Sequence, residues 1–323
     1  MTNNTKKLLG IVLLIVVIAG LVFLFNTKDK QPESNLKEVI TKETSEQPYL
    51  TEITYTNISG KAINTELKKT FKQAGISTKT IDDFLADVLF YNQMIGVNLG
   101  DTFVPEKEKF RTVKNLVPAY NLEFIEQLWE NYEPNDPGEN CRITSFRLLD
   151  DMIDVGNPTT EYSGFMFMDE ESLAFPKRKI NREHLSKFQT VFASIPTAPV
   201  KDQTVHQQKI KEHFKNSQIT FKNADKISLI TVWMHDDLDN VLFVGHTGVL
   251  IKKSNHQWWF LEKVSFQEPY QLLVFKNKTQ LNDYLMAKYD VSWGQPTARP
   301  MIFENDNIIE GFRLNPETTK KQL

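Results

Sequence analysis

An uninterrupted apolar run near the N-terminus is the feature that most constrains how this chain can fold. Residues 8–25 (LLGIVLLIVVIAGLVFLF) form eighteen consecutive positions without a charged or strongly polar side chain. At about 1.5 Å of rise per residue, a helix of this length approaches the hydrocarbon thickness of a bilayer. No other run in the sequence is comparable, so we expect a single transmembrane helix. Lys6 and Lys7 precede the run, a positive start that indicates an export signal.

The residues after this run favour an anchor that is retained rather than cleaved. A signal peptidase site needs small side chains, whereas residues 23–27 (FLFNT) are bulky. No cysteine ends the run, as a lipid anchor would require. We therefore predict a single-pass protein of the cell membrane with its C-terminal domain outside the cytoplasm. Its predicted parts are a cytoplasmic stub (1–7), a transmembrane signal-anchor (8–25), a flexible polar tether (26–48), an extracytoplasmic domain (49–316) and a disordered tail (317–323).

The composition excludes several classes of partner and of site. The formal net charge of −3 predicts no basic surface for nucleic acid. One cysteine excludes an internal disulfide framework, and an exported domain with a single cysteine is typical of a Gram-positive cell surface. We expect no cofactor and no metal, since the acidic turn 235–240 (HDDLDN) lacks the glutamate that closes a calcium loop. We expect a monomer whose partners are the membrane, reached through the N-terminal helix, and a cell-wall peptide or protein substrate.

The hydrophobic periodicity changes along the chain, and this change indicates the fold class. After a strand at 50–56, apolar residues spaced for helices dominate the first half. The predicted helices cover 64–75, 80–95, 121–132, 141–153, 182–195 and 204–214. The second half holds β-branched and aromatic runs at 227–234, 241–252, 257–264 and 271–275, followed by a helix at 279–289. We therefore predict an α+β domain with a helical first half and an antiparallel sheet in the second half.

The single cysteine, Cys141, stands where a helix would activate its thiol. It follows the Pro-Gly turn of 133–140 (EPNDPGEN) and opens the fourth predicted helix. Unpaired N–H groups and the positive end of the helix dipole stabilise a thiolate at such a position. His246 lies in a predicted strand between Gly245 and Gly248, which leave room for another backbone or a substrate. Cys141 and His246 are therefore the candidate nucleophile and base.

A carboxylate in the next strand completes the candidate set. The hairpin between the two strands places Glu262 or Lys263 beside His246, depending on a register that the sequence leaves open. With Glu262 on that face, its carboxylate orients the imidazole as the third member of a nucleophile, base and orienter. With Lys263 there, Ser265 or Gln267 would orient the imidazole, or no residue would do so.

The order of these residues resembles the papain-like superfamily, which includes cysteine peptidases, wall-peptide amidases and transglutaminase-like proteins. A cysteine at a helix start, a Gly-His on a later strand and an aromatic strand beyond it carry the resemblance, with GHTGVLI and WWFLEK the closest segments. The stretch GENCRITSFRLL and the exported N-terminus also resemble an uncharacterised bacterial family, domain of unknown function 4300.

The papain-like resemblance implies a papain-like domain after the transmembrane helix and a particular set of supporting residues. Asn135 or Asn140 would donate to the oxyanion alongside the backbone N–H of Cys141. Trp258 and Trp259 alternate across their strand, and Trp259 is the candidate to line a cleft for a sugar or peptide.

Two functions fit this sequence. The first is a membrane-anchored thiol hydrolase or transferase acting on an amide or peptide bond at the cell wall. In it, Cys141 attacks the carbonyl, His246 moves the proton and Glu262 orients His246. The second is a non-catalytic surface module that binds a wall fragment or a protein partner in the same cleft. A hydrogen bond between Cys141 and His246 would favour the first function, and a cleft filled by Arg142 would favour the second.

Overall fold

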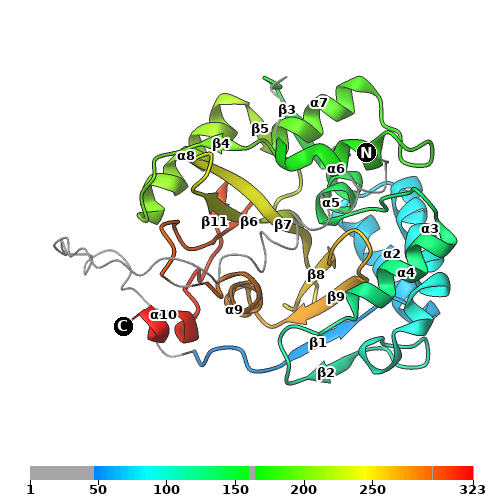
Figure 1. Ribbon diagram of the computed structural model, residues 1–323. Helices are drawn as coiled ribbons and strands as arrows, with labels where there is room; N and C mark the ends of the chain where they lie inside the picture. The colour runs from blue at the N-terminus through cyan, green and yellow to red at the C-terminus, as the bar shows by residue number, and fades with distance from the viewer. Residues whose placement is uncertain (1–46, 160–163, 293, 323) are drawn as a thin grey trace, which may run out of the picture.

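The computed structural model describes residues 47–159, 164–292 and 294–322 (Figure 1). The predicted transmembrane helix at 8–25 and most of the predicted tether lie outside these residues. Within the described ranges, no helix is long and apolar enough to cross a membrane.

An antiparallel sheet organises the described part of the chain (Figure 1). Its nine strands run in the order β11-β10-β6-β7-β8-β9-β1-β2, and β4 pairs with β7 off this path. These strands are β1 (Ile53–Thr56), β2 (Arg111–Val113), β4 (Ile195–Pro196), β6 (Ile227–Asp236), β7 (Val241–Lys252), β8 (Trp258–Lys263), β9 (Tyr270–Phe275), β10 (Met301–Glu304) and β11 (Asn307–Ile308). Two short strands, β3 (Ile153–Val155) and β5 (Ile219–Phe221), form a separate antiparallel pair.

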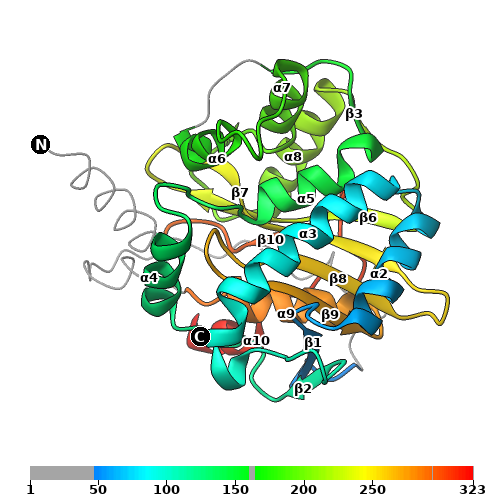
Figure 2. The same ribbon diagram turned by 90° about the vertical axis from the view of Figure 1, so that its right-hand side faces the viewer.

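Helices cover both faces of the sheet (Figure 2). The helices α2, α3 and α5 lie across one face and share its larger buried cluster, whereas α9 packs on the other face. The described α-helices are α2 (Lys61–Ala74), α3 (Thr78–Met94), α4 (Leu122–Tyr132), α5 (Cys141–Leu149), α6 (Phe167–Leu173), α7 (Arg182–Val191), α8 (Gln203–Asn216), α9 (Lys278–Tyr289) and α10 (Pro316–Gln322). Because side chains alternate along a strand, Phe260 and Leu261 of β8 enter different clusters. The sheet therefore separates two cores.

Capping explains where several of these helices begin and end. Gly75 ends α2 in a left-handed conformation with φ 102°, as its position in the sequence predicts. The predicted start of that helix was wrong, because Asn64 lies inside α2 and Gly60 is its N-cap. The hydroxyl oxygen of Ser77 accepts a hydrogen bond from the backbone N–H of Thr80, so α3 begins two residues before the predicted Thr80.

The predicted fold class, a transmembrane helix followed by a papain-like domain with a helical first half and an antiparallel second half, was wrong. The described residues form a mixed α/β domain without a membrane-spanning helix. Strands and helices are interleaved, since β1 pairs with both β9 and β2, and α9 interrupts the later strands. The hydrophobic periodicity of a segment indicates its own conformation but not which strand it pairs with. The predicted division into a helical first half and a β second half therefore failed.

Candidate active site

Cys141 is the first residue of α5, and the preceding residue fixes where this helix begins. The side-chain oxygen of Asn140 accepts a hydrogen bond from the backbone N–H of Ile143 at 2.9 Å, as an N-cap does. The backbone N–H groups of Cys141 and Arg142 belong to the first turn, which has no acceptor within the helix. The helix therefore presents N–H groups and the positive end of its dipole at the thiol.

His246 lies on β7 just after a bulge. Val232 of β6 faces His246 and Trp233 faces Val244, which leaves Gly245 as the extra residue of β7. A bulge of this kind bends a strand and redirects the side chains beside it. His246 consequently stands on the face of the sheet that α9 covers, as does its cross-strand partner Val232.

The sheet is split beside His246. On the edge of β7 away from β6, β4 pairs at residues 241–242 and β8 pairs at residues 249–252. β8 pairs with β9 along its whole length, up to Lys263, but its pairing with β7 ends at Leu261. Among the described strands, this edge of β7 is thus unpaired in the sheet beside His246, whose pKa Cys141 of α5 affects.

Cys141, His246 and Glu262 form a buried cluster. Glu262 Oε2 lies 2.5 Å from His246 Nε2, and Cys141 is near enough to His246 for each to shift the pKa of the other. Because Nε2 is held by Glu262, Nδ1 is the ring nitrogen left for the thiol. The three side chains are buried, with Cys141 6%, His246 1% and Glu262 1% exposed. Between Glu262 and Lys263, it is therefore Glu262 that stands beside His246.

The charges of the site favour a thiolate paired with an imidazolium. Burial raises the pKa of the Cys141 thiol, but the influence of His246 and Arg142 outweighs burial and lowers this pKa. Burial lowers the pKa of His246, but Cys141 and Glu262 outweigh it and raise this pKa. Both shifts favour transfer of the proton from sulfur to nitrogen.

Helix α9 supports the carboxylate from its own side of the sheet. The hydroxyl of Tyr284 donates to Glu262 Oε1, and Lys288 Nζ lies 3.8 Å from Glu262 Oε2. Burial raises the pKa of Glu262, but Lys288, His246 and Tyr284 lower it to about 2. Tyr289 stacks on the His246 ring with centroids 5.2 Å apart and planes at 26°. Glu262 is therefore held as a carboxylate, and the imidazole is held between a carboxylate and a ring.

Arg142 ties α5 to the open edge of β7. Its Nη1 donates to the carbonyl of Val244 at 2.8 Å, and its Nη2 donates to that of Phe165 at 3.2 Å. The guanidinium also pairs with the buried carboxylate of Asp169 at 2.6 Å. Val244 is two residues before His246, so Arg142 joins the helix of Cys141 to the strand of His246.

Other predicted site residues have different places. Asn140 uses its side chain as the N-cap and donates to Asp169 at 2.7 Å, so its amide is already engaged. Asn135 adopts a left-handed φ of 67° in the turn before α5. Trp259 is 2% exposed and packs against Phe110 and under Lys253, so the expectation that its ring is exposed in a cleft was wrong.

The two alternative orienters have roles in the turn after β8. The backbone carbonyl of Ser265 accepts from Lys263 Nζ at 3.0 Å, and Gln267 Nε2 donates to the carbonyl of Pro137 at 3.1 Å. Tyr284, Lys288 and Tyr289, which contact the site, were missed by sequence reasoning. Tyr284 and Lys288 are four residues apart on α9, a spacing that shows they share a helix face but does not reveal what the face contacts.

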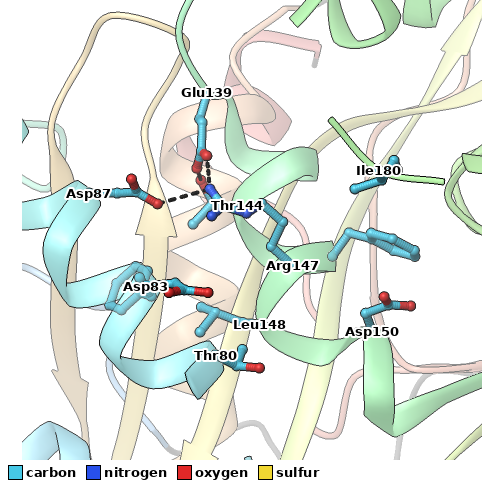
Figure 3. Close-up of a pocket in the computed structure, with 11 residues that line it drawn as sticks. Thr80, Asp83, Asp87, Glu139, Thr144, Arg147, Leu148, Asp150 and Ile180 are labelled. Carbon is cyan, nitrogen blue, oxygen red and sulfur yellow. Dashed lines mark hydrogen bonds and ion pairs between the residues drawn. The ribbon is translucent and has the colours of Figure 1, made fainter. Parts of the chain in front are cut away.

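A cavity of about 120 Å³ lies on the flank of α5 and α3 (Figure 3). Arg147 donates to Asp87 at 2.9 Å and to Glu139 within it, and Asp83 and Asp150 also line it. Cys141, His246 and Glu262 do not line this cavity. In the part of the chain that the structure describes, no group of three His, Cys, Asp or Glu side chains could hold a metal ion.

Comparison with known proteins identifies one family. No curated protein and no solved structure matches the chain. The family model described as Domain of unknown function (DUF4300) matches residues 54–309. These residues include the cysteine, histidine and glutamate of the site and the sheet that positions them. The chain belongs to the DUF4300 family.

Proposed function

We propose that the domain is a cysteine-dependent hydrolase or acyl transferase that acts on an amide or peptide bond. The observation that carries this proposal is the buried cluster of Cys141, His246 and Glu262, in which Glu262 Oε2 lies 2.5 Å from His246 Nε2 and Cys141 opens a helix. A nucleophile, a base and a group that orients the base are the parts that acyl transfer through a thioester requires. The order of the three residues along the chain, which resembles that of papain-like enzymes, also supports it.

The proposed reaction uses each of these residues in turn. The Cys141 thiolate attacks the carbonyl carbon, and the negative charge moves to the carbonyl oxygen. As the tetrahedral intermediate collapses, the C–N bond breaks and the imidazolium of His246 gives its proton to the leaving amine. Water or an acceptor amine then attacks the thioester, while His246 takes the proton and Cys141 leaves as a thiolate. Glu262 keeps the imidazole in place throughout.

The developing oxyanion needs hydrogen-bond donors near the thiol. The backbone N–H groups of Cys141 and Arg142 in the first turn of α5 meet this need, because they have no acceptor in the helix and carry the positive end of its dipole. Asn140 is a weaker candidate, since its amide would have to leave Asp169.

The substrate that we propose is a peptide of the cell wall. The apolar run at 8–25 supports a position at the cell membrane, with the domain outside the cytoplasm. A polar segment between that run and residue 47 limits the distance that the domain reaches from the membrane to tens of ångströms. A substrate close to the membrane is therefore favoured over one in the outer wall.

Acylation of the full-length protein tests this function. Purified protein treated with 4-nitrophenyl acetate should gain one acetyl group on Cys141, detected by mass spectrometry of intact protein and of its peptides. His246→Ala should slow the acylation by roughly 10²- to 10⁴-fold, since a positioned base contributes about that much. Cys141→Ala should give no adduct, with a melting temperature within a few degrees of the unmodified protein.

A histidine outside the site provides the matched control. His213 of α8 contacts the carbonyl of Thr190 at 2.9 Å, so His213→Ala should acylate at the normal rate. Acylation of Cys141→Ala at the rate of the unmodified protein, or equal rates for His246→Ala and His213→Ala, would rule out the proposed chemistry.

The second candidate function is a non-catalytic binding module, and the burial of Cys141 favours it. A thiol that is 6% exposed admits a substrate only if its surroundings move. In a binding module, Cys141→Ala would retain capture of purified wall fragments, and the thiol would resist iodoacetamide in the folded protein.

A further inference from the structure

Lys263 is a buried lysine next to Glu262 that takes no part in the proton transfers of the proposed reaction. Its side chain points to the face of the sheet opposite that of Glu262, toward α5 and α3. Only 2% of the residue is exposed. Lysine is almost never fully buried unless its charge has partners, so this position requires a physical explanation.

Carbonyl oxygens and aromatic rings surround the ammonium. Lys263 Nζ donates to the backbone carbonyls of Ser265 at 3.0 Å and Phe266 at 3.1 Å, and also to that of Glu268. The ring centroids of Tyr91 and Tyr270 lie 4.4 and 5.0 Å from Nζ. Three acceptors and two ring faces stabilise the charged form against the cost of burial.

The turn that Lys263 holds, residues 264–269, packs against the loop that precedes Cys141. Gln267 Nε2 donates to the carbonyl of Pro137, and the hydroxyl of Tyr91 donates to the carbonyl of Gln267 at 2.6 Å. A Cβ added at Gly138 would lie 2.9 Å from the carbonyl oxygen of Phe266, so the turn and the loop are in close contact there. Movement of the turn would therefore disturb the start of α5.

The charge of Lys263 also acts on the site. The titratable groups that face it are Tyr91 from α3, Tyr270 from β9, Glu268 from the turn and Cys141 from α5. Burial lowers the pKa of Lys263 to about 7, against the opposing charges of Glu268 and Cys141. The attraction between Lys263 and Cys141 is mutual, so a charged Lys263 also stabilises the thiolate.

We propose that Lys263 is a positioning residue for the nucleophile. Its ammonium holds the 264–269 turn against the loop that precedes Cys141. Its positive charge adds to that of His246 in stabilising the thiolate. This inference rests on the proposed function in one respect, that Cys141 is the nucleophile.

The pH dependence of thiol alkylation in the full-length protein tests the proposal. The rate at which iodoacetamide modifies Cys141 rises with the thiolate fraction, so its inflection reports the pKa of the thiol. Lys263→Met should move this inflection to higher pH by on the order of one unit, a roughly tenfold smaller thiolate fraction well below the inflection. Lys263→Arg, which keeps the charge, should leave the inflection close to that of the unmodified protein.

Lys253→Met is the matched control for loss of a half-buried lysine from the same face of the sheet. Lys253 lies over the Trp259 ring at 3.8 Å and donates to Thr70, contacts that do not involve the site. The Lys253→Met variant should have a lower melting temperature, but the inflection of its alkylation rate should stay at the same pH. If Lys263→Met also lowers only the melting temperature, Lys263 is merely structural and the inference is wrong.

A measurement on the unmodified sequence guards against a Lys263→Met variant that fails to fold. In protein with ¹³C-labelled lysine, the side chain that titrates near pH 7 should titrate at lower pH once Cys141 is carboxamidomethylated, because coupling is reciprocal. An unchanged titration would overturn the inference. An inflection for Cys141 at the pH of a free thiol would instead count against the proposed function itself.

Discussion

At the residue scale, Glu262 is a buried carboxylate that depends on two elements for its charge. His246 of β7 holds one oxygen, while Tyr284 of α9 donates to the other and Lys288 stands 3.8 Å away. A buried carboxylate without such partners would take up a proton. The lowered pKa of Glu262 is therefore a property of the folded state, and folding stability must depend on pH through it.

The sign of this dependence follows from the direction of the shift. The pKa of Glu262 falls from 4.5 to about 2 on folding, so its contribution is fully present above pH 4.5 and is lost as the pH falls toward 2. Glu262→Gln should be less stable than the unmodified protein at pH 6, and the difference should shrink toward pH 3. Urea unfolding at both pH values measures this, and an equal difference at the two would contradict the assignment.

At the scale of the element, Gly248 marks the point where β7 and β8 part. A Cβ there would lie 2.4 Å from the Phe260 ring and 2.6 Å from the carbonyl oxygen of Leu261. The ring belongs to the core and the carbonyl to the neighbouring backbone, so neither can move freely. The glycines near His246 were expected to leave room for another backbone or a substrate. At Gly248 it is the backbone of the neighbouring strand that comes close.

Substitution of this glycine should therefore destabilise the sheet. We expect Gly248→Ala to cost about 1–3 kcal/mol of unfolding free energy, the usual penalty for overpacking. Gly245→Ala on the same strand is the comparison, because the three atoms nearest to its added Cβ all belong to the flexible side chain of Met234. Thermal unfolding should show the larger loss for Gly248→Ala, and a larger loss for Gly245→Ala would contradict this account of the strand.

Sequence reasoning succeeded for elements whose own residues determine them. The bounds of β7 match the predicted run 241–252, because a run rich in β-branched and aromatic residues ends in polar turns at both sides. It failed for contacts between distant elements: the register that selects Glu262 over Lys263 stayed open, and the contacts of α9 with the site were not anticipated. The short strand β2 carries too little periodicity to be recognised.

At the scale of the whole molecule, the first described residues are bound to α9 and to the segment that precedes α10. Arg313 Nη1 donates to the carbonyl of Gln47 at 2.7 Å, and the backbone N–H of Leu50 donates to Asp283 Oδ2 at 3.0 Å. Arg313 and Asp283 form an ion pair at 2.5 Å. Asp283 belongs to α9, so this clamp of Gln47, Leu50, Asp283 and Arg313 joins both ends of the described chain to that helix.

Loss of the arginine should release this clamp. Arg313→Met leaves the buried carboxylate of Asp283 without its cation, and we expect a loss of about 2–4 kcal/mol, near the lower end for broken buried pairs because Arg313 is partly exposed. Lys79→Met breaks an exposed pair with Asp83 and should cost less than about 0.5 kcal/mol. Chemical denaturation compares the two, and equal losses would show that the clamp contributes little.

The clamp also decides where a mechanical load would enter the domain. Tension on the N-terminal segment reaches Asp283 of α9 through Leu50 and Arg313, and the next residue of α9 is Tyr284, which holds Glu262. The force path therefore runs into the helix that supports the site before it reaches the central strands. Tension applied at Gln47 would therefore act on the hydrogen bond between Tyr284 and Glu262 through one helix.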